Sequence, residues 1–121
     1  MQCLALDRPG RYVVGRSSDC DIQLSSDWVR SVSRHHCVLI FNPPNLRVRD
    51  LGSSNGTFVN GEKVGQCMAA DDDNAEAQIA GSQEYELKSG DELRLGRLAF
   101  QISIADNGQM SELEELPLSY F

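Results

Sequence analysis

The sequence predicts an all-β fold, a two-layer antiparallel β-sandwich, and three observations support this prediction. Short apolar runs rich in β-branched residues recur along the chain, at 2–6, 12–14, 21–24, 37–41, 46–50, 57–59, 63–64, 85–87, 92–95 and 99–104. Turn-forming residues lie between the runs, and the interior contains no segment that favours a helix. This combination is typical of β-sandwiches.

The individual runs support this prediction in order along the chain. Turn signals separate them at 9–10 (Pro-Gly), 43–45 (Pro-Pro-Asn), 55–56 and 60–61 (Asn-Gly) and 89–91 (Ser-Gly-Asp). The pair Asn60-Gly61 joins two runs through only two residues, which is the strongest short hairpin signal. Residues alternate with a period of two, as expected of strands, in three of the later runs: Leu46, Val48 and Asp50; Leu93 and Leu95; and Phe100, Ile102 and Ile104.

Residues 1–105 are predicted to form one domain, because 121 residues suffice for one two-layer core but not for two. The segment 65–83 is rich in alanine, aspartate and glycine, so we expect a flexible acidic insertion. Its aspartates at 71–73 lack the glycine and glutamate of a calcium loop, and a solvated charge run is the preferred interpretation. The tail 106–121 has Ser111 and Glu114 at capping-box spacing, which predicts at most a two-turn helix or a linker.

Composition and cysteine spacing narrow the class of protein. Hydrophobic residues make up 40% and charged residues 24% of the chain, as in soluble globular proteins. No apolar run approaches the roughly 18 residues that span a bilayer, and there is no signal-peptide pattern, so we expect no membrane association. The four cysteines form no CxxC pair and neither histidine completes a zinc spacing, so no metal or cofactor is predicted. Spacing alone does not exclude disulfides, but buried free thiols of the reducing cytoplasm are the preferred interpretation.

Charge is distributed unevenly along the chain. Residues 1–61 contain seven arginines and five acids, a net charge of +2, whereas residues 62–121 contain four basic residues and thirteen acids, a net charge of −9. The overall charge of −7 argues against a nucleic-acid surface, which needs a basic patch. The positive half suits a small anion, because a guanidinium group can bind phosphate through two hydrogen bonds. A solvated surface with uneven charge is the alternative.

Three turns carry polar residues that point to a function. Gly15 and Arg16 end one strand, the turn 33–36 (SRHH) precedes another, and the loop 51–56 (LGSSNG) lies between two strands. Fixed cations with short hydroxyl and amide donors, and without an acid–base pair, favour capture of an anion over catalysis.

Enzymatic alternatives have weaker support. Ser33, His36 and Asp50 supply the residue types of a catalytic triad, but the sequence has no nucleophile elbow. The glycines match neither a dinucleotide fingerprint nor a phosphate loop with its lysine. We expect Asp50 and Asp21 to tie loops and Thr57 to be framework.

Five motifs occur together in an order that is typical of one family. They are GR at 15–16, CDIQL at 20–24, VSRHHC at 32–37, DLGSSNGTFVNG at 50–61 and LKSGDELRLG at 87–96. The sequence resembles a forkhead-associated (FHA) domain from residue 15 to about residue 104. The resemblance implies a β-sandwich of the FHA type whose apical loops bind phosphothreonine in a partner protein, without catalysis. An FHA-like domain that binds its partner independently of phosphorylation is the alternative.

The resemblance assigns roles to residues in three loops. A phosphate group adds about −1.5 to −2 charges and three acceptor oxygens, and it is expected to be bound by Arg16, Ser33 and Arg34. Asn55 is expected to bind the ligand backbone through its carbonyl and amide groups. Structural support of the site is assigned to Gly15, His36 and Gly56. The alternatives are a surface arginine, a turn serine and a plain Asn-Gly turn.

The sequence departs from the family pattern before Ser33. Eight residues, SSDWVRSV, lie between Leu24 and Ser33, which is more than the family usually has. This insertion puts Trp28 in a possible specificity loop, where it either contacts the ligand or anchors the loop. The other members of that loop set are Arg30, Ser31 and Ser54. Some family members have an arginine where Ser31 stands, so selection of an acidic ligand residue here would depend on Arg30.

The threonine content bears on the partner. Thr57 is the only threonine in the chain, and it begins a predicted strand. A phosphothreonine ligand therefore belongs to another polypeptide or to a part of the protein outside this sequence. A serine/threonine kinase or its substrate is the expected partner.

Overall fold

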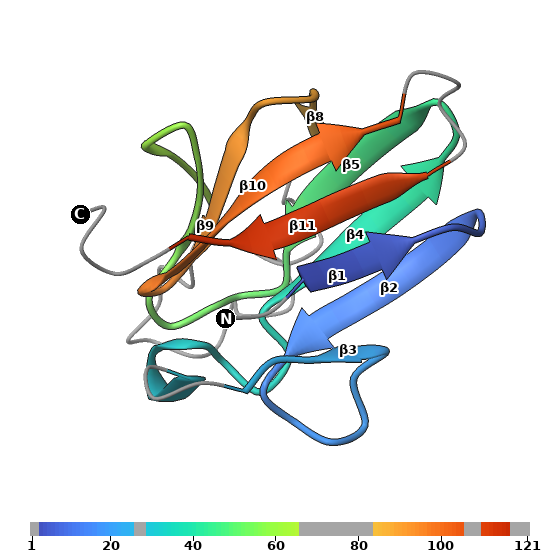
Figure 1. Cartoon of the computed structure of the whole chain (residues 1–121). Coiled ribbons are helices and arrows are strands. Elements are labelled where there is room, and N and C mark those ends of the chain that lie inside the picture. The colour runs from blue at the N-terminus through green and yellow to red at the C-terminus, as the bar shows by residue number, and fades with distance from the viewer. Residues whose placement is uncertain (1–2, 26–28, 66–83, 106–109, 117–121) are drawn as a thin grey trace.

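The computed structural model describes residues 3–25, 29–65, 84–105 and 110–116, which form a sandwich of two β-sheets (Figure 1). The elements are β1 (Cys3–Leu6), β2 (Gly10–Gly15), β3 (Ile22–Gln23), the 3-10 helix η1 (Val29–Ser31), β4 (Cys37–Asn42), β5 (Asn45–Asp50), β6 (Thr57–Val59), β7 (Glu62–Gly65), β8 (Tyr85–Leu87), β9 (Glu92–Leu95), β10 (Leu98–Ile104) and β11 (Ser111–Glu115). One sheet has the strand order β1-β11-β10-β9-β6-β7, and the other has β3-β2-β4-β5-β8. Only β2 and β3 pair in parallel among the described strands. The predicted all-β sandwich is confirmed.

Side chains alternate between core and solvent as the sequence pattern predicts. In β5, Leu46 and Val48 are buried, and in β10, Phe100 and Ile102 are buried on either side of the exposed Gln101. These residues belong to one apolar cluster with contributions from both sheets. Burying each such side chain contributes about 1.5–3 kcal/mol, so this cluster is the main source of stability.

The predicted hairpin at Asn60-Gly61 is confirmed. Val59 pairs with Glu62 across the turn, and the two central residues have φ values of 52° and 83°. Positive φ at both positions is the geometry of a type I′ turn, which asparagine and glycine adopt at least cost. The turn is fixed to the neighbouring strand, because Asn60 N donates to Glu92 O at 2.9 Å and Glu92 N donates to Asn60 Oδ1 at 2.9 Å.

A short helix near Ser111, one of the two expectations for the tail, is wrong. Residues Ser111–Glu115 form β11, which lies between β1 and β10 and pairs with both (Figure 1). Leu113 is 1% exposed in this strand and belongs to the core cluster. Pairing with two strands and burial of Leu113 stabilise the strand more than the capping-box pattern stabilises a helix. The tail assigned to 106–121 therefore contains a strand of the sandwich.

Some predictions concern residues outside the described part of the chain, namely Trp28, Cys67 and the insertion after Gly65. Of the described cysteines, all are free thiols. Cys37 is buried as expected, but Cys3 is exposed because it lies on the solvent face of the edge strand β1. Among the described residues there is no helix long and apolar enough to cross a membrane.

Backbone hydrogen bonds join the three polar turns singled out by the sequence. Arg16 N donates to Ser33 O at 3.2 Å, which joins the end of β2 to the turn before β4. Leu51 N donates to His36 O at 3.0 Å, which joins that turn to the loop after β5. The sandwich therefore holds all three turns against one another at one site.

Candidate functional site

The three turns enclose a cleft of about 210 Å³ that contains most of the predicted site residues. It is lined by Arg16, Arg30, Ser31, Val32, Ser33, Arg34, Ser54 and Asn55. Three of these residues are arginines and none carries a carboxylate, so the cleft is electropositive. Sequence reasoning did not single out Val32, whose side chain is buried and whose backbone carbonyl faces Arg16.

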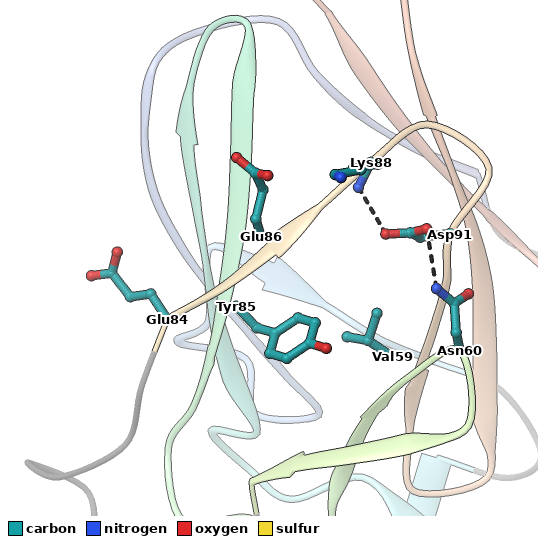
Figure 2. Close-up of a pocket in the computed structure, with 7 residues that line it drawn as sticks. All are labelled: Val59, Asn60, Glu84, Tyr85, Glu86, Lys88 and Asp91. Carbon is teal, nitrogen blue, oxygen red and sulfur yellow. Dashed lines mark hydrogen bonds between the residues drawn. The ribbon is translucent and has the colours of Figure 1, made fainter.

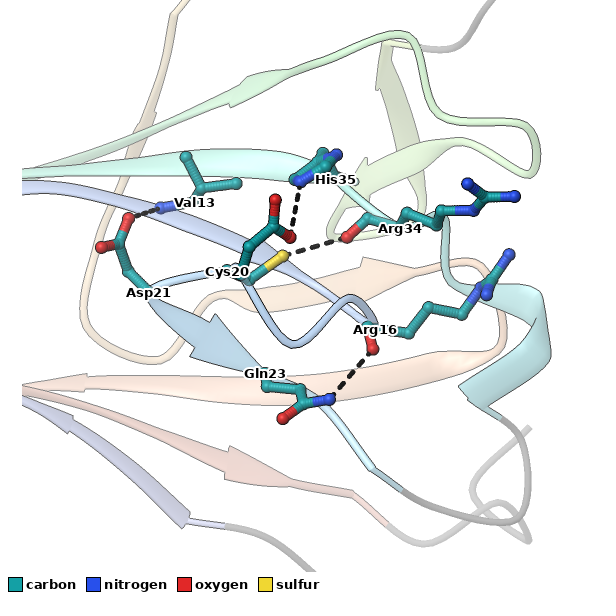
Figure 3. Close-up of polar contacts among 8 residues, drawn as sticks. Val13, Arg16, Cys20, Asp21, Gln23, Arg34 and His35 are labelled. Carbon is teal, nitrogen blue, oxygen red and sulfur yellow. Dashed lines mark hydrogen bonds and ion pairs between the residues drawn. The ribbon is translucent and has the colours of Figure 1, made fainter.

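Arg16 is held by its own side chain as well as by its backbone. Its Nε donates to Val32 O at 2.9 Å, and neither terminal amino group has a partner among the described residues. The Arg34 guanidinium extends in the same direction as that of Arg16 (Figure 3). Two exposed arginines, of which Arg16 is fixed through its Nε, therefore present N–H donors to the same cleft.

Gly15 allows the turn at Ser33–Arg34 to approach β2. A Cβ on Gly15 would lie 2.0 Å from Arg34 O and 2.9 Å from Ser33 O, both backbone atoms. These distances are far below a van der Waals contact, so any side chain there would push the turn at Ser33–Arg34 away from β2. Position 15 therefore requires glycine because there is no space for a side chain, and not because of a positive φ.

Ser33 is oriented by the loop opposite. Its Oγ accepts a hydrogen bond from Ser54 N at 3.0 Å. This bond occupies a lone pair of the hydroxyl and leaves its hydrogen available to an acceptor in the cleft. Ser33 is therefore prepared to donate to an anion.

His36 lies beneath the cleft with 0% exposure. Its Nδ1 receives the hydrogen bond of Ser33 N at 3.1 Å, so Nε2 carries the proton and donates to Gly56 O at 2.9 Å. Burial lowers the pKa of His36, and the bond to Gly56 and the charge of Asp50 oppose this only partly. A neutral imidazole in one tautomer thus braces two of the three loops.

Asn55 is fixed on the opposite side of the cleft. Its Nδ2 donates to Ser31 O at 2.8 Å, while its Oδ1 has no partner among the described residues. Gly56 follows with φ of 92°, a left-handed conformation that favours glycine. The exposed carboxamide therefore retains an acceptor for a ligand.

Gly96 supports Asn55 indirectly through Ser31, a role that the sequence does not indicate. Gly96 has φ of 61°, and a Cβ there would lie 2.2 Å from Ser31 O. The next residue, Arg97, donates its backbone N–H to Ser31 Oγ at 2.8 Å. The β9–β10 turn thus holds η1 in place, a contact that could be found only from the packed sheets.

Asp50 organises the loop that contains Ser54 and Asn55. It is 1% exposed, and its Oδ2 accepts from Gly52 N at 2.7 Å and from Ser53 N at 3.0 Å. Its Oδ1 accepts from the hydroxyls of Ser53 and Thr57. All these interactions tie the loop internally, as expected of Asp50; likewise Asp21 Oδ2 accepts from Val13 N at 2.8 Å, so it too ties a loop.

Comparison with known proteins identifies the family. The family model described as FHA domain matches residues 12–96, which is more than half of the chain. The chain belongs to the FHA domain family. This assignment agrees with the sandwich and with the position of the cleft among its loops.

Relatives include the ABC transporter ATP-binding/permease protein Rv1747 of Mycobacterium tuberculosis, which is 40% identical over 65 residues. That match covers 54% of this chain and only 7% of the transporter. Among solved structures, the FHA-2 domain of Rv1747 is 29% identical with a TM-score of 0.55, covering 91% of this chain and 77% of that one. The FhaA FHA domain complexed with the intracellular domain of Rv3910 is 25% identical with a TM-score of 0.53, covering 88% and 80%.

A larger cleft lies elsewhere on this FHA domain and has the wrong charge for an anion. It has a volume of about 590 Å³ and is lined by Val59, Asn60, Glu84, Tyr85, Glu86, Lys88 and Asp91 (Figure 2). Three carboxylates outnumber the single ammonium group, so a phosphate would be repelled there. Charge and donor arrangement, and not size, distinguish the arginine-lined cleft.

The triad residue types do not form a catalytic relay. His36 Nδ1 accepts from the backbone of Ser33 and not from its hydroxyl, and Nε2 is occupied by Gly56 O. A base of this kind must contact the nucleophilic hydroxyl. The geometry of Ser33, His36 and Asp50 therefore fits loop support, which agrees with an FHA domain as a recognition module.

Proposed function

We propose that this FHA domain is a non-catalytic signalling module that binds phosphothreonine on a partner protein. The observation that carries the proposal is the shared cleft of Arg16, Ser33 and Arg34, with no lining carboxylate. Two guanidinium groups and a hydroxyl donor match the charge and the acceptor oxygens of a phosphate. One solved structure is described as an analysis of phosphothreonine-dependent FHA domain interactions, which supports the same ligand class. It is 25% identical to this chain at a TM-score of 0.54, and the match covers 91% of this chain and 81% of that one.

Each phosphate contact has a defined source in the proposed complex. Arg16 supplies its terminal amino groups, because Nε already donates to Val32 O. Ser33 supplies its hydroxyl hydrogen, because Ser54 N already donates to its oxygen. Hydrogen bonds of this kind to charged groups contribute about 1.5–3 kcal/mol each.

Asn55 and the neighbouring loops are proposed to read the peptide around the phosphothreonine. Asn55 Oδ1 is placed to accept a backbone N–H of the ligand, since its amide is held by Ser31 O. Arg30, Ser31 and Ser54 line the same cleft and are proposed to contact flanking side chains. Trp28 is assigned to the same specificity loop from the sequence.

The partner is proposed to be a serine/threonine kinase or its substrate, recognised in trans. Thr57, the only threonine of the chain, is 0% exposed and donates its hydroxyl to Asp50 Oδ1 at 2.6 Å. A phosphate does not fit at such a position, so the ligand threonine lies on another polypeptide or outside this sequence. We place this recognition in the cytoplasm, with neither nucleic acid nor membrane as a partner.

A phosphothreonine peptide-library screen, followed by affinity measurements on the selected peptide, tests the proposal. Arg16→Ala should weaken binding by about 10- to 100-fold, the equivalent of one charged hydrogen bond. Arg11→Ala is the matched control, because Arg11 is an exposed arginine in β2, the strand that Arg16 follows, and lies outside the cleft. Equal affinity for the unphosphorylated peptide would instead support an FHA-like domain that binds independently of phosphorylation.

A further inference from the structure

Three potential metal ligands from two loops converge beside the arginine-lined cleft. Asp19 and Cys20 lie between β2 and β3, and His35 lies in the turn before β4. Their carboxylate oxygen, thiol sulfur and imidazole nitrogen all lie within 4.8 Å of one another. Cys20 and His35 are fifteen positions apart in the sequence, so no short spacing motif marks this group.

Small rotations of the three side chains would bring their ligand atoms to the spacing of a tetrahedral metal site. Zinc bonds of about 2.0–2.3 Å place tetrahedral ligand atoms roughly 3.3–3.8 Å apart. The three ligand atoms lie within 4.8 Å of one another, and His35 Nε2 lies 2.9 Å from Asp19 Oδ1. The side chains of His35 and Asp19 are 48% and 68% exposed, so both can rotate to admit an ion between them.

We propose that Asp19, Cys20 and His35 bind one zinc-class metal ion in an open, three-ligand site. A mixed set of sulfur, nitrogen and oxygen donors suits Zn²⁺ and Co²⁺ better than Ca²⁺ or Mg²⁺, which prefer oxygen ligands. Solvent completes the fourth position, because two of the three ligands lie at the surface.

The backbone between the loops provides support for such a site. Ser17 N donates to Arg34 O at 3.2 Å, and Cys20 N donates to Ser17 O at 3.1 Å. These bonds fix the main chain on which both Cys20 and His35 are carried. The ligand side chains therefore need rotamer changes, and not a rearrangement of the loops, to close on an ion.

The site is connected to the cleft through the backbone carbonyl of Arg34. The Cys20 thiol donates to Arg34 O at 3.0 Å, as Figure 3 shows. A metal ion replaces the thiol proton, so this bond is lost and Arg34 O keeps the backbone hydrogen bond from Ser17 N. An effect of the bound metal on phosphopeptide affinity rests on the proposed function, and the peptide would change metal affinity by the same factor. Metal binding itself does not depend on the proposed function.

Titration of the 121-residue chain with Co²⁺, followed by displacement with Zn²⁺, tests the proposal. Cys3→Ser and Cys67→Ser are introduced as background, which leaves Cys20 and the fully buried Cys37. We expect one equivalent of Co²⁺ to give a thiolate-to-cobalt charge-transfer band, and Zn²⁺ to abolish it.

Variants then assign the ligands. Cys20→Ser should remove the band, and His35→Asn and Asp19→Asn should each weaken binding by at least about 10-fold, since even indirect metal contacts have effects of this size. Asp7→Asn, another exposed aspartate, is the matched control and should change nothing. Absence of the band in the background protein, or a band unaffected by Cys20→Ser or by both other variants, overturns the proposal. Thermal unfolding of each variant confirms that the fold is retained. The cobalt band is measured without peptide, so it distinguishes failure of the metal site from failure of the proposed phosphopeptide binding.

Discussion

Protonation of His36 should destabilise the folded domain as the pH falls. His36 is buried with 0% exposure, and its Nδ1 accepts the backbone hydrogen bond of Ser33. A protonated imidazole cannot accept that bond, and burial disfavours its charge, so the pKa of His36 is lowered in the folded state. The unfolded chain, with an ordinary histidine pKa of about 6.5, therefore binds the proton first.

The sign and the size of the effect follow from this difference. Below about pH 6.5 the unfolded state holds more protons than the folded state, so the free energy of unfolding decreases as the pH is lowered. One proton limits the slope to about 1.4 kcal/mol per pH unit. The slope ends once the pH passes below the lowered folded-state pKa, where both states are protonated.

Urea unfolding without ligand, measured from pH 7.5 to pH 5, provides the assay. The slope of unfolding free energy against pH should be smaller in His36→Gln than in the wild type, because this side chain does not titrate. His35→Asn, which removes the exposed neighbouring histidine, is the matched control and should retain the His36 contribution. Identical slopes for the wild type and His36→Gln would refute the assignment of His36 as a neutral buried brace.

Three further substitutions test other parts of the structure. Gly15→Ala places a Cβ 2.0 Å from Arg34 O, so we expect a loss of about 1–3 kcal/mol by urea unfolding together with weaker phosphopeptide binding; unchanged stability would contradict the close approach. Asp50→Asn places an amide N–H donor where N–H and O–H donors need an acceptor, so the free energy of unfolding should fall by at least about 1–3 kcal/mol, with Asp7→Asn as the control. Leu113→Ala should cost about 2–5 kcal/mol because this side chain is 1% exposed, and a near-neutral effect would mean that β11 is not part of the core.

Local sequence patterns were sufficient for the strands whose faces differ in polarity. The alternation around Leu46 and Val48 identifies their buried face directly, and Asn60-Gly61 specifies its own turn through positive φ. β11 was missed because a capping-box pattern is a weak local preference, whereas its pairing with β1 and β10 involves residues from 7 (Ile104 to Ser111) to 111 (Cys3 to Glu114) positions away. The buried positions Ser111 and Leu113 do show the period of two that indicates a strand.

Of the candidate cleft, only the residues that stand in family motifs could be predicted from the sequence. Arg16, Ser33 and Asn55 stand in family motifs, so the resemblance could bring them together before any coordinates. The Gly96 contact with Ser31 and the approach of Asp19 to His35 depend on how loops from separate strands pack. Such contacts have no local signature, because neither partner is near the other in sequence.

Chemical-shift mapping of backbone amides during titration with a phosphothreonine peptide tests the central claim most directly. The perturbed amides should be those of the arginine-lined cleft, including Ser33, Arg34 and Ser54, while Lys88 and Asp91 in the acidic cleft should be unaffected. The unphosphorylated peptide should cause no such changes. Perturbations centred on the acidic cleft, or equal responses to both peptides, would contradict recognition of phosphate by Arg16, Ser33 and Arg34.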